Sequence, residues 1–291
     1  MRISRRRLLQ SMIGTGFGVT AASLGGVSYG RWVETEWLEI VRRDLHFEGL
    51  PTGLEGLRIA VLADFHLHPY TRLEYIQNCI VEAQRLDPDL VVFLGDFVQS
   101  TAEAIFDLAP ALAKLNSTLG SFCILGNHDN WKGPLVVEEG LRRSGLPLLQ
   151  NRGVTLEFGG DSFYLAGVDE CWSGTPDLPA AMDGHRSGTF TVLLSHEPDA
   201  AVGYARDRRI NLQLSGHSHG GQVRFPFFGS PFLPPYGRIY DLGLYQVEKM
   251  QLYTNRGIGV TAPIRINCRP EVTLLTLRSS GRSTASGGEV S

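Results

Sequence analysis

Short apolar runs alternate along the chain with segments in which apolar residues recur every three or four positions. The runs have the length and composition of buried strands. They lie at residues 57–63, 90–94, 121–125, 190–194 and 211–214. Further strands are expected in a hairpin over 155–168, near 244–253 and near 272–277, and amphipathic helices over 72–86 and 102–115. This alternation predicts an α/β fold.

The apolar runs end in polar residues of a restricted kind. Their endings are Asp64-Phe65-His66, Gly95-Asp96, Gly126-Asn127-His128-Asp129, Ser195-His196 and Gly216-His217-Ser218-His219. Open α/β sheets form their ligand crevices at the carboxyl ends of strands. One histidine there would be an ordinary structural residue, but five of the eight histidines lie at these endings. Together with Asp and Asn they predict a site for borderline divalent ions such as Mn, Fe or Zn.

In this order the endings resemble the five signature blocks of the calcineurin-like metallophosphoesterase superfamily, over residues 57–277. The resemblance implies a layered sandwich of two mixed β-sheets flanked by helices, with two metal ions at one edge. It implies seven ligands: Asp64, His66 and His219 on one ion, Asn127, His196 and His217 on the other, and Asp96 as the bridge. We therefore expect two divalent ions as cofactors, with Mn as the first choice and Zn, Fe or Mg as alternatives.

The resemblance also implies hydrolysis of a phosphoester by attack of a hydroxide that bridges the two ions. His128 would stabilise the developing charge or protonate the leaving oxygen. Asp129 has two alternative roles, because it could orient His128 or cap the following helix. The second block continues with Gln99-Ser100-Thr101 instead of the Asp-Arg-Gly found in phosphoprotein phosphatases, which disfavours protein phosphatase activity.

The first 43 residues differ in charge from the remainder. They carry a net charge of +4, which leaves −7 for the rest of a chain whose total is −3. Arg5-Arg6-Arg7-Leu8-Leu9 precedes an uncharged run that ends near Tyr29, and it resembles the twin-arginine export motif. We therefore expect the twin-arginine export machinery as a partner and a location in the periplasm or on the outer face of the cytoplasmic membrane, with the signal cleaved or kept as an anchor.

Three segments are expected along the chain. Residues 1–43 are the signal or membrane anchor with its linker, 44–277 the metallophosphoesterase domain, and 278–291 a disordered Ser- and Gly-rich tail. The acidic body does not indicate the basic groove of a nucleic-acid binder, so no nucleic acid is expected as a partner. The sequence leaves the oligomeric state open.

Features after the fifth block indicate a branch of the superfamily. Gly220-Gly221-Gln222 and the runs 253–259 and 263–271 resemble a membrane-associated, twin-arginine-exported bacterial branch. This branch is similar to lipid-pathway enzymes that cleave phosphodiester or pyrophosphate links, including UDP-diacylglucosamine hydrolases. The resemblance makes a membrane surface an expected partner.

The loop after the fifth block is the expected substrate contact. Phe225, Phe227 and Phe228 crowd this loop, where they form either a lipophilic rim for an acyl chain or membrane, or ordinary loop packing. Arg224 and Arg256 are either ligands of a nonreacting phosphate or members of surface ion pairs.

These features predict a dimetal phosphodiesterase or pyrophosphatase that acts on a lipid-linked or nucleotide-linked phosphoester. Two alternatives stay open: a phosphomonoesterase or nuclease on the same centre, and a non-catalytic binding module stabilised by metal. His128 argues against the binding module, because a purely structural metal site does not need this residue beside Asn127.

Overall fold

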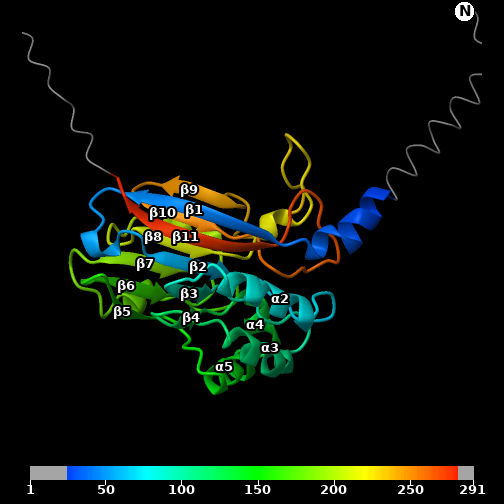
Figure 1. The fold of residues 1–291 in the computed structure, drawn as a ribbon, viewed down its shortest axis with the longest axis horizontal. Helices are drawn as coiled ribbons and strands as arrows, with labels where there is room; N and C mark the ends of the chain where they lie inside the picture. Colours follow the sequence, from blue (N-terminus) through cyan, green and yellow to red (C-terminus); the bar gives the residue numbers. More distant parts are fainter. Residues whose placement is uncertain (1–24, 281–291) are drawn as a thin grey trace, which may run out of the picture.

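The computed structural model describes residues 25–280 of the 291-residue chain. Two β-sheets pack face to face with helices outside them (Figure 1), which confirms the predicted layered sandwich. Both sheets are mixed, because each contains parallel and antiparallel strand pairs. The twin-arginine sequence lies outside the described residues, as do residues 281–291 of the predicted tail.

The first sheet has the strand order β1-β11-β2-β3-β4. Its strands are β1 (Glu39–Phe47), β11 (Glu271–Ser279), β2 (Arg58–Leu62), β3 (Leu90–Phe93) and β4 (Ser121–Cys123). Strands β2, β3 and β4 run parallel to one another. Their carboxyl ends therefore open at the same edge of the sheet.

The second sheet has the strand order β5-β6-β7-β8-β10-β9. Its strands are β5 (Arg152–Phe158), β6 (Asp161–Gly167), β7 (Phe190–Leu194), β8 (Leu212–Ser215), β10 (Met250–Thr254) and β9 (Gly243–Val247). The predicted hairpin is β5–β6, whereas the single strand expected near 244–253 is the hairpin β9–β10. Its turn contains Glu248 at a φ of 52° and no glycine, so the usual sequence signal for a turn is missing.

Side chains that alternate across the strands build the apolar layers. In β2, Ile59 and Val61 pack between the two sheets, whereas Ala60 and Leu62 pack against the outer helices. Burial on both faces explains the uninterrupted apolar runs of the sequence. The helices are α2 (Leu73–Gln84), α3 (Ile105–Leu112) and α5 (Pro134–Arg143) on the first sheet, and α6 (Leu178–Ala181) and α7 (Ala201–Tyr204) on the second.

The folded part of the chain begins earlier than the expected boundary at residue 44. Strand β1 starts at Glu39, inside the segment expected to be signal and linker, and residues 25–32 form a helix. Because β1 is an edge strand, its residues Arg42, Arg43 and Asp44 are exposed, and its sequence lacks an apolar run. Within residues 25–280, no helix combines the length and apolar character needed to span a bilayer.

Candidate metal centre

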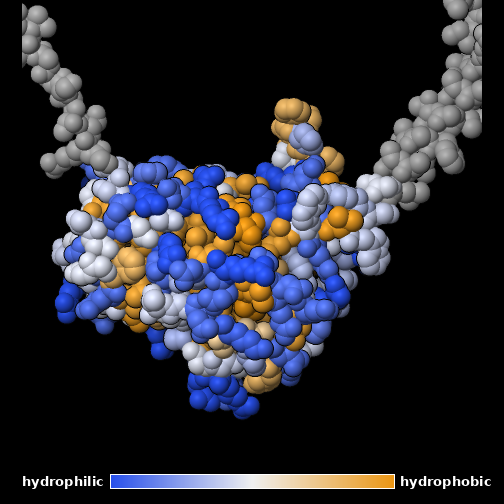
Figure 2. Space-filling view, viewed as in Figure 1, coloured by the Kyte–Doolittle hydropathy of each residue, from blue (hydrophilic) through white to orange (hydrophobic). Residues whose placement is uncertain are grey.

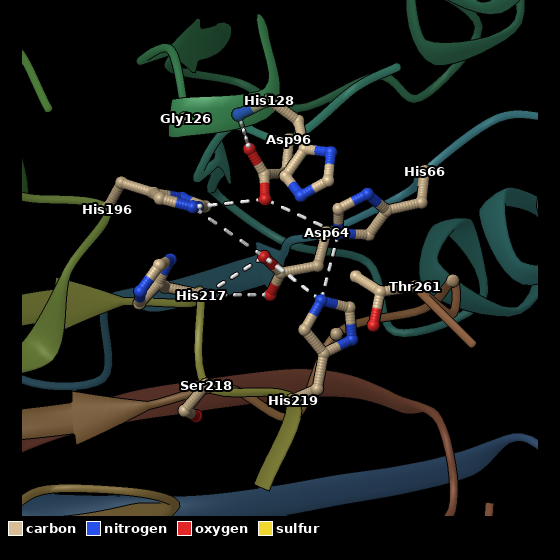
Figure 3. A network of polar contacts seen from close by, with 12 residues as sticks. Asp64, His66, Asp96, Gly126, His128, His196, His217, Ser218, His219 and Thr261 are labelled. Carbon is tan, nitrogen blue, oxygen red and sulfur yellow. Dashed lines mark hydrogen bonds and ion pairs between the residues drawn. The ribbon is translucent and has the colours of Figure 1, made fainter. Parts of the chain in front are cut away.

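The polar endings of five strands meet at one edge of the sandwich. They follow β2, β3 and β4 of the first sheet and β7 and β8 of the second. The backbone bends sharply there, because Asp64, His66, Asp96, His217 and His219 have φ angles between 44° and 69°. Such left-handed conformations are costly for residues other than glycine, and they concentrate at functional sites. Figure 3 shows side chains of these loops pointing toward a common centre.

Asp64, His66 and His219 form one group of potential ligands. One nitrogen or oxygen atom of each lies within 4.8 Å of the others. The Nε2 atoms of His66 and His219 are 2.9 Å apart. The Asp64 carboxylate also accepts the backbone N–H of His217 at 2.9 and 3.0 Å, which ties the loops after β2 and β8 together. Two imidazole nitrogens this close to a buried carboxylate are arranged to share a cation.

Asp96, His196 and His217 form a second group with the same spacing. Asn127 joins them, because its Oδ1 lies 2.9 Å from Nδ1 of His217. The Oδ2 atom of Asp96 lies 3.3 Å from Nε2 of both His66 and His196, so this carboxylate stands between the two groups. The structure thus brings together all seven side chains that the sequence singled out as ligands.

Backbone carbonyls orient two of these imidazoles. Nδ1 of His196 donates to the carbonyl of Leu94 at 2.6 Å, and Nε2 of His217 donates to the carbonyl of Pro235 at 2.8 Å. The other nitrogen of each ring therefore faces the centre, as in many metal-binding histidines. Nε2 of His196 is buried and has no hydrogen-bond partner among residues 25–280. These nitrogen and oxygen donors, with no thiolate, fit two borderline divalent ions.

Burial keeps two histidines of the centre in the neutral form, whereas nearby carboxylates favour the charged form of a third. Burial lowers the pKa of His66 to about 3 and that of His217 to about 4, so both rings are neutral at neutral pH, the form that binds metal. Burial acts on His196 too, but the nearby charges of Asp96, Glu197 and Asp64 outweigh it and raise the pKa of His196 well above its ordinary value. A divalent ion would displace the proton from His196.

His128 and Asp129 lie in the first turn of the short helix α4 (Asn127–Lys132) but make different contacts. The backbone N–H of His128 donates to Oδ1 of Asp96 at 2.8 Å, and its ring centroid lies 4.7 Å from that of His66. The Asp129 carboxylate accepts the backbone N–H groups of Gly126, Phe97 and Val98 at 2.9 to 3.2 Å. These contacts match the capping role of Asp129 and not the orientation of His128.

A cavity of about 890 Å³ opens above the metal centre. Its floor includes Asp96, Asn127, His128, His217 and His219. Its walls include two tryptophans that the sequence analysis missed, Trp131 and Trp172, and the apolar residues Pro231, Phe232, Leu233 and Ile264. Trp172 follows Asp169-Glu170 after β6, so a sixth polar strand ending was the signal that could have pointed to it.

The five residues expected to contact substrate lie elsewhere. Phe225, Phe227 and Phe228 are outside the cavity lining, in a turn between β8 and β9 that the hydrogen bond from Phe225 N–H to Gly229 closes. Arg224 and Arg256 are also outside the lining. Arg224 pairs with Asp241 at 2.6 Å, and Arg256 pairs with Glu271 and Glu39, so the ion-pair alternative holds for both cations. A sequence cannot show which distant carboxylate neutralises an arginine.

Comparisons with known proteins find a matching family model and relatives that cover most of the chain. Residues 57–221 match the family model described as calcineurin-like phosphoesterase. The chain is 36% identical to an uncharacterised metallophosphoesterase of Bacillus subtilis, YkuE, over 96% of this chain and 99% of that protein. It is 32% identical to the phosphodiesterase YaeI of Escherichia coli, over 94% of this chain and 99% of that protein. A solved NAD nucleotidase of Haemophilus influenzae is 17% identical over 70% of this chain and 45% of that one, with a TM-score of 0.47.

Proposed function

Because the chain belongs to the calcineurin-like phosphoesterase family and is a metal-dependent phosphoester hydrolase, we propose that it cleaves phosphodiester or pyrophosphate links in lipid-linked or nucleotide-linked substrates. The observation that carries this proposal is the cavity above the metal centre. Its volume of about 890 Å³ exceeds the needs of a phosphate group, and its walls are largely aromatic and aliphatic. Such walls suit the second substituent of a diester, which a monoester lacks.

The seven ligand side chains would hold two divalent ions, for which Mn, Zn, Fe and Mg are the candidates. When bound, the ions supply positive charge to the phosphate oxygens and lower the pKa of a water molecule that serves as nucleophile. His128 lies beside this centre. Burial lowers the pKa of His128, which favours a neutral imidazole that donates a hydrogen bond to developing negative charge.

We expect the protein, stripped of metal by a chelator and then reloaded, to hydrolyse bis(p-nitrophenyl) phosphate faster than p-nitrophenyl phosphate. His128→Gln should lower the diester turnover by about 10²- to 10³-fold, because it removes one group that stabilises charge in the transition state. Steady-state rates with Mn, Zn or Mg restored are the measurement. His46→Gln is the matched control, because His46 is exposed on β1.

The same assay separates the alternatives. A faster monoester reaction would replace the proposal with a phosphomonoesterase. If the metal-loaded protein turns over neither ester, nor a lipid-linked pyrophosphate, the binding-module alternative would stand.

We also propose that the protein works at a membrane surface, through the loop of residues 225–232. Phe227 is fully exposed and Phe228 is 90% exposed at the tip of this loop. The loop projects from the upper edge of the molecule, and Figure 2 shows apolar side chains at its tip. The segment of residues 265–266 connects the base of this loop to the N-terminal helix of residues 25–32. The backbone N–H of Arg224 donates to the carbonyl of Ile266, and the backbone N–H of Arg265 donates to the carbonyl of Gly30. An apolar tip beside the start of the folded chain suits insertion into a lipid interface.

We expect Phe227→Ser/Phe228→Ser to weaken binding of the full chain to phospholipid vesicles by about tenfold or more per residue, since burying one Phe side chain contributes roughly 1.5–3 kcal/mol. Vesicle co-sedimentation is the measurement. Phe106→Ser/Leu135→Ser is the matched control, because these residues are exposed on α3 and α5, away from the loop. Equal binding by both double variants would refute the membrane contact.

We further propose that the twin-arginine machinery exports the chain to the periplasm or to the outer face of the cytoplasmic membrane. The support is the sequence Arg5-Arg6-Arg7-Leu8-Leu9 and the uncharged run that follows it. Cell fractionation checks this location, and a purely cytoplasmic protein would overturn it.

A further inference from the structure

Two tryptophans form an exposed aromatic corner in the wall of the cavity. Trp131 is 46% exposed and Trp172 is 40% exposed. Their ring centroids are 4.8 Å apart and their planes meet at 81°. Both residues line the cavity above the metal centre. Aromatic side chains bury roughly 150–250 Å² each when they are covered. Two of them left open in one cavity therefore indicate a surface that a ligand covers.

The corner lies next to His128 and His217, two of the residues at the metal centre. Trp131 lies one helical turn after His128 on α4, and its ring centroid is 5.0 Å from the imidazole. Trp172 lies 6.0 Å from the ring of His217. A substituent on the phosphorus therefore reaches the corner directly from the metal centre.

A buried carboxylate fixes the loop that presents Trp172. Glu170 is fully buried, and it accepts the backbone N–H groups of Trp172 at 2.7 Å and Ser173 at 2.9 Å. It also accepts from the side chain of Asn130, the residue before Trp131, at 2.9 Å. One carboxylate thus ties both sides of the corner together. A binding surface held in this way loses little conformational freedom when a ligand binds.

The polar groups behind the corner hydrogen-bond to one another or, like Oδ1 of Asn130, are buried, so what remains toward the cavity is aromatic surface. Asn130, Glu170 and Ser173 hydrogen-bond among themselves, which leaves few partners for the hydroxyl groups of a sugar ring. A cationic headgroup is disfavoured, because Arg238 lines the same cavity and two divalent ions would add further positive charge. An acyl chain finds aliphatic neighbours at Leu233 and Ile264 instead.

We propose that the corner of Trp131 and Trp172 is a binding subsite for a planar heteroaromatic ring, a nucleobase, carried by the group attached to the reacting phosphate. This inference rests on the proposed function, which leaves the substrate either lipid-linked or nucleotide-linked. The inference names the nucleotide-linked substrate. The base stacks on one tryptophan and contacts the other with its edge. The chain then recognises a nucleotide-linked substrate through shape and stacking.

The test uses the full chain loaded with Mn and measures binding of UMP, AMP and ribose 5-phosphate by isothermal titration calorimetry. We expect UMP and AMP to bind more tightly than ribose 5-phosphate. Trp131→Ala and Trp172→Ala should each weaken nucleotide binding by roughly 5- to 100-fold, the range for stacking of one base on one aromatic side chain. Binding of ribose 5-phosphate should stay within about twofold, because it lacks the base.

Two further variants separate stacking from a structural effect. Trp172→Phe keeps an aromatic ring and should restore most of the nucleotide affinity. Trp37→Ala is the matched control, because Trp37 is 50% exposed and lies outside the cavity lining. Equal binding of UMP and ribose 5-phosphate by the wild type would overturn the inference, and so would tighter binding of phosphocholine than of UMP. A protein that binds UMP through Trp172 but hydrolyses no diester would keep this inference and refute the proposed function.

Discussion

Replacing Asp96 with Asn is expected to lower diester turnover by roughly 10³-fold, which corresponds to several kcal/mol of lost charge stabilisation. Its Oδ2 lies 3.3 Å from Nε2 of both His66 and His196, and its Oδ1 accepts the N–H of His128 at 2.8 Å. Only Asp64 and Asp96 supply negative charge among the seven ligand side chains. The amide keeps the volume but removes one of these two charges.

Metal content distinguishes this effect from a general loss of structure. Asp96→Asn should retain less metal than wild type after gel filtration, while its circular dichroism spectrum is unchanged. Asp107→Asn is the matched control, because Asp107 is exposed on α3 and outside the cavity lining. Wild-type metal content together with wild-type turnover in Asp96→Asn would contradict the bridging role.

The centre could be predicted from the sequence because the pattern that reveals the strands, an apolar run followed by polar residues, also marks where the site residues lie. A strand buried on both faces is an uninterrupted apolar run, so the first polar residues after it mark the sheet edge. Asp64, Asp96 and His196 all stand at such positions. The strand endings therefore located the candidate residues, and the family resemblance divided them between two ions. The tautomers depend on the carbonyls of Leu94 and Pro235, which only the folded chain supplies.

The errors have equally specific causes. Strand β1 carries exposed charges because it lies at an edge and pairs only with β11. Arg256 was a candidate for phosphate binding, but Glu39 reaches it from 217 positions away in the sequence. The aromatic corner was missed because Trp131 lies on α4 and Trp172 lies in the loop after β6, and only the folded chain brings the two rings together above the buried Glu170.

Arg265 shows how the chain supports the metal centre from behind. Its guanidinium is fully buried and makes no ion pair among residues 25–280. It donates instead to four backbone carbonyls, those of Arg256, Gly257, Gly259 and Cys268, at 2.7 to 3.2 Å. The same segment holds the first ligand loop, because Gly259 N–H donates to the carbonyl of Asp64 at 2.7 Å. Arg265 is therefore a positioning residue for Asp64.

Arg265→Met is expected to lower the free energy of unfolding by about 3 kcal/mol or more. The carbonyls of Arg256, Gly259 and Cys268 lose their donor, whereas the carbonyl of Gly257 keeps the N–H of Glu271, and each buried carbonyl left without a donor costs roughly 1–3 kcal/mol. The midpoint of urea unfolding measures the change. The midpoint of Arg265→Lys should lie between those of wild type and Arg265→Met, since an ammonium has three donors for four carbonyls. Under conditions in which Arg265→Lys stays folded, it should bind metal more weakly than wild type. Arg85→Met is the control, because Arg85 is exposed on the surface. A wild-type midpoint in Arg265→Met would show that the loop beside Asp64 is held by other contacts, and the centre would then depend on its ligands alone.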